Sequence, residues 1–585
     1  MLYPVESESR ECKDLGGIWG FRADPEGTGY DEKWHLRPLT ETIPMPVPSS
    51  YNDVTQDTAI RDHIGSVWYD RLFYVPRSWE GGRIVLRFGS VTHRAIVWVN
   101  GREIARHLGG FLPFEAEISE HVAFGAENRL TVAVSNVLDF VSLPHGTIHE
   151  FDDDLHPPGY RELRTHGDIF NYAGIHRPVT LYCTPRCHIA GIAVETGLDG
   201  ATGTVKYSAT IEGGSGKEEL RVELVDDAGR EVARASGIAG KMRVSGVCPW
   251  EPGAPYLYTL VAKLSSGDTY RLPVGVRTVA VEGDQFLING KPFFFRGFGK
   301  HEDWDVRGRG IDPVMLVKDM NLLRWCGANS FRTSHYPYAE EIVRLADREG
   351  IVIIGEAPAL SSWIPQDKKD QETYEATREY HAQVMRELIA RDRNSPSVVM
   401  WSVANEVDTG SEAAERYFKE IIEVTRKADP TRPVTIVGCI PVDQCRVSSM
   451  VDVVSVNRYF GWYTDSGHLD LIEHQVDADL RRWHERFGKP VLLSEFGADT
   501  IAGLHQDPPV MFTEEYQVEL LRRTIDAAER LPFVVGTHVW NFADFNTKQG
   551  VRRVDGNKKG VFTRDRRPKM AAHYLRERWG KGAGE

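Results

Sequence analysis

The feature that most constrains this chain is an alternation of short apolar strands and amphipathic helices over roughly its last 300 residues. In the segment EYHAQVMRELIARD, for example, Val384, Met385, Leu388 and Ile389 form one apolar face at helical spacing. Eight strand-and-helix units of this size are typical of a (β/α)8 barrel. The predicted strands lie in FFFRGFG, NSFRTSHY, IVIIGE, SVVMWSVANE, PVTIVG, DVVSVNRY, PVLLSEFG and VVGTHVWNF.

The first half of the chain has a different sequence pattern, which indicates strands and turns but no helices. Short runs rich in β-branched and aromatic residues, such as RIVLRF and RLTVAVSN, are bounded by turn residues and favour a jelly-roll β-sandwich. Later runs such as TVKYSATI and ELRVELVD alternate with GGSG and SSGD turns, which favours an immunoglobulin-like sandwich. We therefore predict a jelly-roll domain over 1–182, an immunoglobulin-like domain over 183–278 and the barrel over 279–585.

Composition excludes several classes of protein. A net charge of −14 argues against general nucleic-acid binding, which needs a broad basic face. No apolar run approaches the ~20 residues of a membrane span, and MLYPVESESR lacks the features of a secretory signal. The seven cysteines form no CxxC pair, so we expect reduced thiols and a cytoplasmic location. Neither Cys183 with Cys187 nor Cys439 with Cys445 has further ligands, and we expect no metal and no cofactor.

Two glutamates follow apolar strands directly. The fourth predicted strand ends in Asn405-Glu406 and the seventh in Ser494-Glu495. In (β/α)8 barrels the chemistry lies at the carboxyl ends of the strands, where two such side chains can face each other across a substrate. Glycoside hydrolysis requires this pair, one acid to protonate the leaving oxygen and one carboxylate to attack the anomeric carbon. The alternative is a pair of ion-paired structural glutamates at the barrel rim.

Polar and aromatic residues at neighbouring strand ends favour the catalytic interpretation. A lone histidine or strand tryptophan is more often part of a core, but these residues share one predicted edge of the barrel. Aromatic faces and hydrogen-bonding groups around two acids are what a sugar pocket requires. The residues are His335 after the second strand, Asn457, Tyr459 and Tyr463 after the sixth, and Trp540 after the eighth.

Several of these segments resemble glycoside hydrolase family two. The resemblance runs in order over nearly the whole chain, and NYAGIHRPV and GNKKGVFTRDRRPK resemble the members that cleave β-glucuronides. It implies the three-domain architecture and retention of anomeric configuration, with Glu406 as acid/base and Glu495 as nucleophile. The segments are NGKPFFFRGFGKHED, FRTSHYPYAEE, SVVMWSVANE, VNRYFGWY, LLSEFGAD and WNFADF.

A basic run, RRVDGNKKG, is unexpected in an acidic chain. A solvated surface loop is the usual explanation of such a run. The resemblance offers another, because an Asn-x-Lys motif in the family binds the C6 carboxylate that distinguishes a glucuronide from a glucoside. Here the motif matches Asn557 and Lys559, and Arg553 matches a nearby family contact. We expect Arg552 and Lys558 to face solvent.

Further family positions match residues of this chain. Asp168, in GDIFNYAG, would reach from the first domain into the barrel mouth and bind sugar hydroxyls. Two departures stand out: the acid/base motif reads Asn-Glu-Val where many relatives have Asn-Glu-Pro, and APALSSWIPQDKKDQETYEA is shorter than the corresponding loop of some bacterial relatives. The matching pocket residues are His335, Asn405, Tyr459, Tyr463 and Trp540.

The sequence thus predicts an exo-acting hydrolase of small-molecule β-glucuronides, with no nucleic-acid or membrane partner. The family often assembles, so we expect a homo-oligomer, a tetramer or a dimer. A β-galacturonidase with the same mechanism is the nearest alternative, since both sugars carry the carboxylate that Asn557 and Lys559 would bind. A β-galactosidase or β-mannosidase needs no such cations. A catalytically silent uronate-binding protein is the alternative from another class, against which the intact Glu406 and Glu495 argue.

Overall fold

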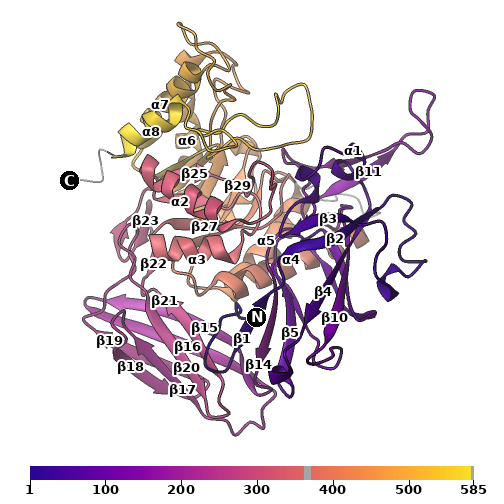
Figure 1. Cartoon of the computed structure of the whole chain (residues 1–585). Helices are drawn as coiled ribbons and strands as arrows, with labels where there is room; N and C mark the ends of the chain where they lie inside the picture. The colour runs from indigo at the N-terminus through magenta and orange to yellow at the C-terminus, as the bar shows by residue number, and fades with distance from the viewer. Residues whose placement is uncertain (362–370, 581–585) are drawn as a thin grey trace.

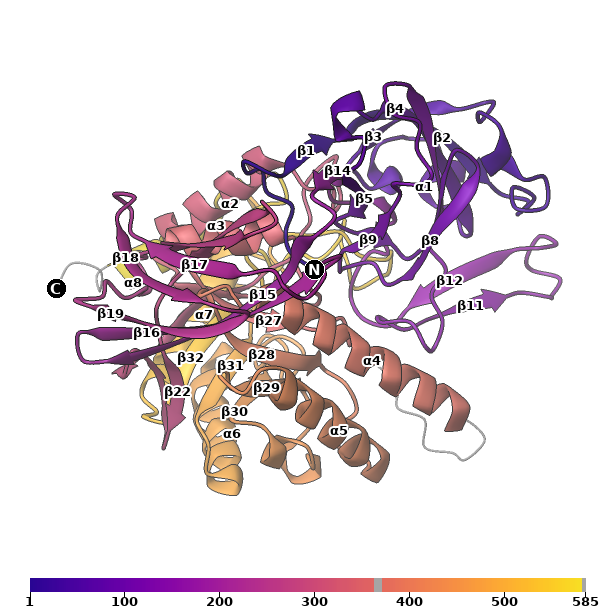
Figure 2. The same cartoon turned by 90° about the horizontal axis from the view of Figure 1, so that it is seen from below.

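The computed structural model describes residues 1–361 and 371–580. The chain forms a β-sandwich, a second β-sandwich and a closed barrel in that order, which confirms the predicted fold class. In Figure 1 the first sandwich lies to the right, the second at the lower left and the barrel above them. Figure 2, seen from below, shows both sandwiches beside the barrel.

The first domain packs two antiparallel sheets face to face, one of four strands (β1-β14-β5-β9) and one of six (β3-β2-β4-β10-β7-β8). Alternation along the strands places Val67 and Tyr69 of β4 between the sheets with Val132 and Val134 of β10. The elements are β1 (Glu11–Asp14), β2 (Gly17–Asp24), β3 (Ile43–Val47), α1 (Thr58–Arg61), β4 (Ser66–Tyr74), β5 (Arg83–Phe88), β6 (Val91–Thr92), β7 (Arg94–Val99), β8 (Arg102–Leu108), β9 (Phe114–Glu117), β10 (Glu127–Ser135), β13 (Gly174–Ile175) and β14 (Val179–Thr184).

A hairpin of β11 (Gly146–Glu150) and β12 (Arg161–Thr165) projects from the first domain (Figure 2). The chain that follows it carries Asp168 towards the barrel.

The second domain is a seven-stranded sandwich of a three-stranded sheet (β15-β16-β19) and a four-stranded sheet (β18-β17-β20-β21). Its core contains Val205 and Tyr207 from one sheet and Val222, Leu224 and Leu260 from the other, as expected of an immunoglobulin-like sandwich. The strands are β15 (His188–Asp199), β16 (Thr202–Glu212), β17 (Leu220–Val225), β18 (Glu231–Ser236), β19 (Ala239–Ser245), β20 (Tyr258–Leu264) and β21 (Thr269–Val274).

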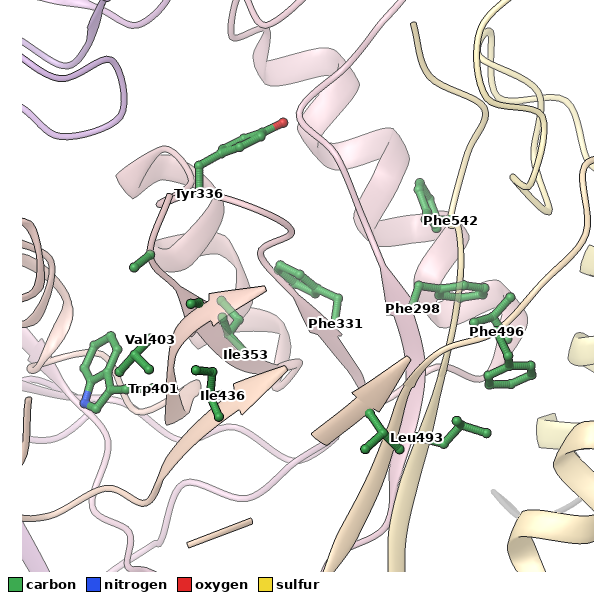
Figure 3. Close-up of a cluster of buried hydrophobic side chains, with 14 of the residues drawn as sticks. Phe298, Phe331, Tyr336, Ile353, Trp401, Val403, Ile436, Leu493, Phe496 and Phe542 are labelled. Atoms are coloured by element: carbon green, nitrogen blue, oxygen red, sulfur yellow. The ribbon is translucent and has the colours of Figure 1, made fainter. Parts of the chain in front are cut away.

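The barrel is closed by eight parallel strands in sequence order, from β25 to β32. Apolar side chains fill the space around the strands, and Figure 3 shows Phe298, Phe331, Ile353, Ile436 and Leu493 among them. The strands are β25 (Phe295–Gly299), β26 (Ser330–Arg332), β27 (Val352–Glu356), β28 (Val398–Asn405), β29 (Val434–Gly438), β30 (Val453–Asn457), β31 (Val491–Glu495) and β32 (Val534–Val539).

Buried apolar residues close the amino-terminal end of the barrel. A small sheet of β22 (Val279–Glu282), β23 (Gln285–Ile288) and β24 (Lys291–Pro292) leads into it. Phe286 and Ile288 of β23 join one buried cluster with Phe295, Val352 and Leu492 of the barrel strands. Because this end is filled, the opposite end is where a substrate can enter.

Helices follow every barrel strand but one in the described residues. The connection from β29 to β30 contains only short 3-10 turns, so the prediction of eight regular units was wrong there. Its sequence, CIPVDQCRVSSMVD, is too short for a helix with two loops and carries a proline. The helices are α2 (Pro313–Cys326), α3 (Glu340–Glu349), α4 (Gln371–Asp392), α5 (Glu412–Ala428), α6 (Ile472–Phe487), α7 (Glu514–Glu529) and α8 (Met570–Gly580).

Local sequence sets the helix ends. At the start of α2, the Asp312 carboxylate accepts the backbone N–H groups of Val314 and Met315, and Pro313 occupies the first turn. The helix ends at Gly327, whose φ of 77° suits a residue without a β-carbon. The shortened loop that we noted after β27 includes residues 362–370, which lie outside the described part of the chain; α4 already begins at Gln371.

Two absences concern the described residues alone. We find no helix among them with the length and apolarity needed to cross a membrane. Nor do they contain a group of three or more His, Cys, Asp or Glu side chains placed to hold a metal ion.

Candidate active site

A pocket of about 460 Å³ opens at the carboxyl ends of the barrel strands. Its walls combine strand ends that are far apart in sequence with one residue of the first domain, Asp168. Eleven of the twelve residues predicted from the sequence line it, and the twelfth, Lys559, lies directly behind the wall. The eleven are Asp168, His335, Asn405, Glu406, Asn457, Tyr459, Tyr463, Glu495, Trp540, Arg553 and Asn557.

Glu495 is the last residue of β31 and is 3% exposed. Its Oε1 accepts a hydrogen bond from Arg332 Nη2 at 2.5 Å, and its Oε2 accepts one from the Tyr459 hydroxyl at 2.6 Å. Donors to both oxygens suit an ionised carboxylate, which only accepts. The arrangement also fixes the direction in which the carboxylate faces the pocket.

Arg332 belongs to a buried network that the sequence analysis missed. Its Nη1 donates to both oxygens of Glu356, the last residue of β27, at 2.8 Å. Burial by itself would lower the pKa of Arg332, but Glu356 and Glu495 outweigh it and raise that pKa. Burial would likewise raise the pKa of Glu356, yet Arg332 and His335 hold it below its usual value. Arg332 is therefore a permanent cation behind Glu495.

Glu406 follows β28 directly in a left-handed backbone conformation, with φ of 52°. This conformation is uncommon for a residue with a side chain and is often found at functional sites. Its Oε1 accepts a hydrogen bond from Asn457 Nδ2 at 2.9 Å. Burial away from water is the larger cause that raises the pKa of Glu406, and the negative charge of Glu495 is the second. The pocket thus favours the protonated form of this carboxyl.

The amides behind the two glutamates are themselves held in place. Asn457 Nδ2 also lies 3.2 Å from Asn405 Oδ1, and Asn457 Oδ1 accepts from the Ser494 hydroxyl at 2.9 Å. Asn405 Oδ1 in turn accepts from Arg332 at 3.3 Å. These bonds link Glu406 to Arg332, and through it to Glu495, so the positions of the two carboxyls are coupled.

An imidazole and an indole form another wall. The ring of His335 stacks on Trp540, with centroids 4.9 Å apart and planes 19° from parallel. Its Nδ1 lies 2.9 Å from Glu356, and its Nε2 lies 3.8 Å from Glu495. With Nδ1 hydrogen-bonded to a carboxylate, Nε2 is the nitrogen directed at the pocket.

Opposite charges meet in the corner formed by Asp168, Arg553, Asn557 and Lys559. Asp168 Oδ2 accepts from Arg553 Nε at 2.9 Å and from Asn557 Nδ2 at 2.8 Å. The Tyr463 hydroxyl accepts from both cations, from Arg553 Nη2 at 2.7 Å and from Lys559 Nζ at 2.8 Å. Lys559 and Asn557 are each 1% exposed. The donors of this corner are buried or partly buried and hydrogen-bonded to one another's partners, whereas the side chains of a solvated loop would be exposed and without such bonds.

The two remaining cations of the basic run point elsewhere. Arg552 is exposed, and Lys558 Nζ pairs at 3.0 Å with the exposed Asp555. A second carboxylate, that of the buried Asp499 in the segment after β31, contacts Lys559 and Arg553.

Three residues of the site, Arg332, Glu356 and Asp499, were not predicted from the sequence. Glu356 carries a signal that could have revealed it, since it ends the strand IVIIGE as Glu495 ends its own. Arg332 lies in FRTSHYPYAEE and Asp499 in LLSEFGAD. Their partners come from distant parts of the chain, and no local sequence pattern indicates such contacts.

The chemistry open to this pocket follows from its two glutamates. Glu495 receives donors on both oxygens, while the pKa of Glu406 is raised. A carboxylate with a carboxylic acid nearby can attack an anomeric carbon and protonate the departing oxygen. Donors gathered in one corner can in addition bind an anionic group of the sugar.

Comparison with known proteins identifies relatives over the whole chain. Residues 12–185 match the sugar binding domain of glycosyl hydrolases family 2, residues 187–277 match glycosyl hydrolases family 2, and residues 279–582 match its TIM barrel domain. A β-glucuronidase of Paenibacillus borealis is 54% identical, with 99% of each chain covered.

Two solved structures are similar throughout. The β-D-glucuronidase structure for Dictyoglomus thermophilum has a TM-score of 0.94 at 51% identity, with 99% of each chain covered. The β-glucuronidase from Ruminococcus gnavus in complex with C6-substituted uronic isofagomine has a TM-score of 0.94 at 38% identity, again with 99% of each chain covered.

Proposed function

Since this chain belongs to the glycosyl hydrolases of family 2, we propose that it releases glucuronic acid from β-D-glucuronides with retention of anomeric configuration. One observation carries the substrate class: the buried Asn557 lines one corner of the pocket that holds Glu406 and Glu495, and the buried Lys559 donates to Tyr463 in the wall of that corner. A panel of chromogenic β-glycosides tests it. We expect the glucuronide to be cleaved with the highest kcat/KM, ahead of the galacturonide, glucoside, galactoside and mannoside.

The reaction has two steps. In the first, a Glu495 oxygen attacks the anomeric carbon while Glu406 gives its proton to the glycosidic oxygen, so that the aglycone leaves and a glycosyl ester forms. In the second, Glu406, now ionised, takes a proton from water as the water oxygen attacks the same carbon, and Glu495 is released. Tyr459 and Arg332 hold Glu495 in its attacking orientation during both steps.

Recognition of the uronate requires a position between the two cations where an oxygen atom can accept hydrogen bonds from both. The Tyr463 hydroxyl oxygen accepts from Arg553 and from Lys559 at once. A C6 carboxylate oxygen that displaces or joins this hydroxyl would accept the same two charged donors, and Asn557 could donate to its second oxygen. Tyr463 is 48% exposed, so it can move aside more easily than the buried residues around it.

We also propose where and in what form the protein works. All seven cysteines are unpaired, which supports a reducing compartment such as a bacterial cytoplasm. Release of glucuronic acid from glucuronides would place the protein in carbohydrate metabolism. We propose assembly as a dimer or tetramer, which sedimentation measurements test.

The alkaline limb of the pH profile should report Glu406. This residue must be protonated in the first step, and burial and Glu495 raise its pKa. Activity is therefore present below that pKa, and kcat/KM should fall as the pH rises through it. We expect the limb in wild-type turnover of an alkyl glucuronide and its loss in Glu406→Gln assayed on an activated aryl glucuronide. A limb that persists unchanged in this variant would assign it to another group.

Lys559→Ala should remove most of the preference for glucuronides. Loss of a buried charge-assisted contact that leaves a carboxylate unpaired costs about 2–5 kcal/mol. We therefore expect kcat/KM for an aryl glucuronide to fall by roughly two to three orders of magnitude. The informative quantity is the ratio of kcat/KM for the glucuronide to that for the glucoside, which should collapse here and in Asn557→Ala.

Lys558→Ala is the matched control, because its side chain pairs with Asp555 at the surface. It should keep the wild-type ratio. Equal behaviour of the Lys558 and Lys559 variants would mean that the carboxylate is recognised elsewhere.

A further inference from the structure

We propose that Asp499 is a positioning residue that gives the pocket its preference for a uronate, by holding Lys559 and the backbone beside it where the C6 carboxylate binds. The proposal rests on the proposed function, because it concerns how a glucuronide is recognised. Asp499 lies four residues beyond Glu495, is 3% exposed and does not line the pocket. Its negative charge repels a C6 carboxylate, so Asp499 can favour this group only through the donors that it holds.

The surroundings of the Asp499 carboxylate consist of donors. Its Oδ1 accepts the backbone N–H of Lys558 at 2.8 Å. Its Oδ2 accepts from Lys559 Nζ, in a close contact, and from Arg553 Nη1 at 3.2 Å. Both oxygens are therefore used as acceptors, which an ionised carboxylate allows and an amide does not. An asparagine here would turn an N–H group towards one of these donors.

Lys559 depends on this carboxylate for its charge balance. Among the described residues, Asp499 is the one carboxylate within ion-pair distance of the Lys559 ammonium. The other close neighbours are the Tyr463 hydroxyl and the rings of Tyr463, Trp462 and Tyr459, with centroids 4.7, 5.2 and 5.7 Å from Nζ. A buried ammonium without a carboxylate partner is costly. Asp499 thus holds the Lys559 side chain beside Tyr463 before substrate arrives.

Asp168 does not duplicate this role. It belongs to the first domain, its side chain is 38% exposed, and it pairs with Arg553 and Asn557. Arg553 and Lys559 carry two positive charges, and Asp168 and Asp499 carry two negative ones. The corner therefore has no surplus charge, and the placement of its donors has to supply the recognition of an anion.

An alternative interpretation of the same contacts predicts the opposite effect of removing Asp499 on substrate binding. A second carboxylate beside Lys559 could simply compete with the substrate for the ammonium, and its removal would then tighten binding. The backbone N–H of Lys558 favours the positioning role, because Asp499 ties the chain that carries Lys559 as well as its side chain.

The test compares Asp499→Asn with Asp555→Asn, which removes the exposed carboxylate paired with Lys558 from the same loop. We expect Asp499→Asn to raise KM for an aryl glucuronide and to lower the glucuronide-to-glucoside ratio of kcat/KM by roughly 10- to 100-fold. The change should lie mainly in KM, with kcat less affected. Asp555→Asn should match the wild type in both quantities.

A double variant separates positioning from stability. Asp499→Asn in the Lys559→Met background removes both charges of the pair, which buried pairs tolerate better than loss of one. Its kcat/KM for the glucuronide should lie close to that of Lys559→Met alone, because Arg553 keeps its ion pair with Asp168. This comparison also decides the matter if Asp499→Asn by itself unfolds.

Three results would overturn the proposal: a lower KM in Asp499→Asn, equal losses on glucuronide and glucoside, or a double variant far less active than Lys559→Met. A wild type that shows no preference for glucuronides would refute the proposed function itself. A wild-type preference that Asp499→Asn keeps would refute only the role of Asp499.

Discussion

Glu495→Gln is expected to abolish turnover of every β-glucuronide. An amide is a poor nucleophile and cannot form the glycosyl ester on which the two-step reaction depends. Removal of a catalytic nucleophile lowers kcat by between about 10⁴- and 10⁶-fold. The same variant should keep its fold, since Gln has the shape of Glu. Circular dichroism and the thermal midpoint check this.

Labelling identifies the nucleophile independently. A 2-fluoro glucuronide with a good leaving group should form a stable ester with the wild-type protein, and mass spectrometry of peptides should place the label on Glu495. A label on any other residue would show that the assignment is wrong.

Tyr459→Phe is a useful comparison for the nucleophile. It removes the hydrogen bond to Glu495 Oε2 but leaves the carboxylate and its contact with Arg332. A hydrogen bond to a charged group contributes about 1.5–3 kcal/mol, so kcat should fall by roughly 10- to 100-fold. A loss as large as that of Glu495→Gln would indicate a more direct role for Tyr459.

Glu406→Gln is expected to harm substrates according to their leaving groups. General acid catalysis contributes roughly 10²- to 10⁴-fold, and it matters most when the departing oxygen is strongly basic. Alkyl glucuronides should therefore lose nearly all activity, while dinitrophenyl glucuronides should still form the glycosyl ester. With no base to activate water, the second step then becomes slow.

Azide provides the decisive measurement for Glu406. As a small anionic nucleophile it needs no general base, so it should restore turnover of the activated glucuronide in Glu406→Gln and yield the β-azide. The wild type should be little affected by azide. An α-azide product, or equal losses for all leaving groups, would remove Glu406 from the role of acid/base.

The barrel and its two glutamates follow from local sequence. In parallel strands joined by helices, all carboxyl ends lie at one edge, so a residue that ends a strand must lie at the mouth of the barrel. Glu406 and Glu495 were predicted on this basis, as were His335, Asn457 and Trp540, and all five line the pocket. The helix missing between β29 and β30 was not foreseen, because the strands on either side are regular and only the connecting length differs.

Sequence patterns could not define the partners of these residues. Arg332 joins Glu356 to Glu495. The strands of Arg332 and Glu356, β26 and β27, pair directly, but β31, which carries Glu495, pairs with neither, and only the closed barrel brings its end close to them. Asp168 reaches Asn557 across 389 positions of sequence, which no local periodicity records. The resemblance to a known family supplied Asp168, whereas the roles of Arg332 and Asp499 needed the structure.

The clearest division between the two kinds of information lies at Lys558 and Lys559. From the sequence alone they are adjacent, identical cations, and only an Asn two positions earlier distinguished the second through the family motif. In the folded chain the Lys558 backbone is fixed, with its N–H bound to Asp499 and its carbonyl accepting from Thr500 and Lys569. This directs its side chain to Asp555 at the surface and that of Lys559 to the interior. Local sequence determined which residues end the strands, but burial of a charge depends on a partner brought from a distant segment, and only the tertiary structure decided that.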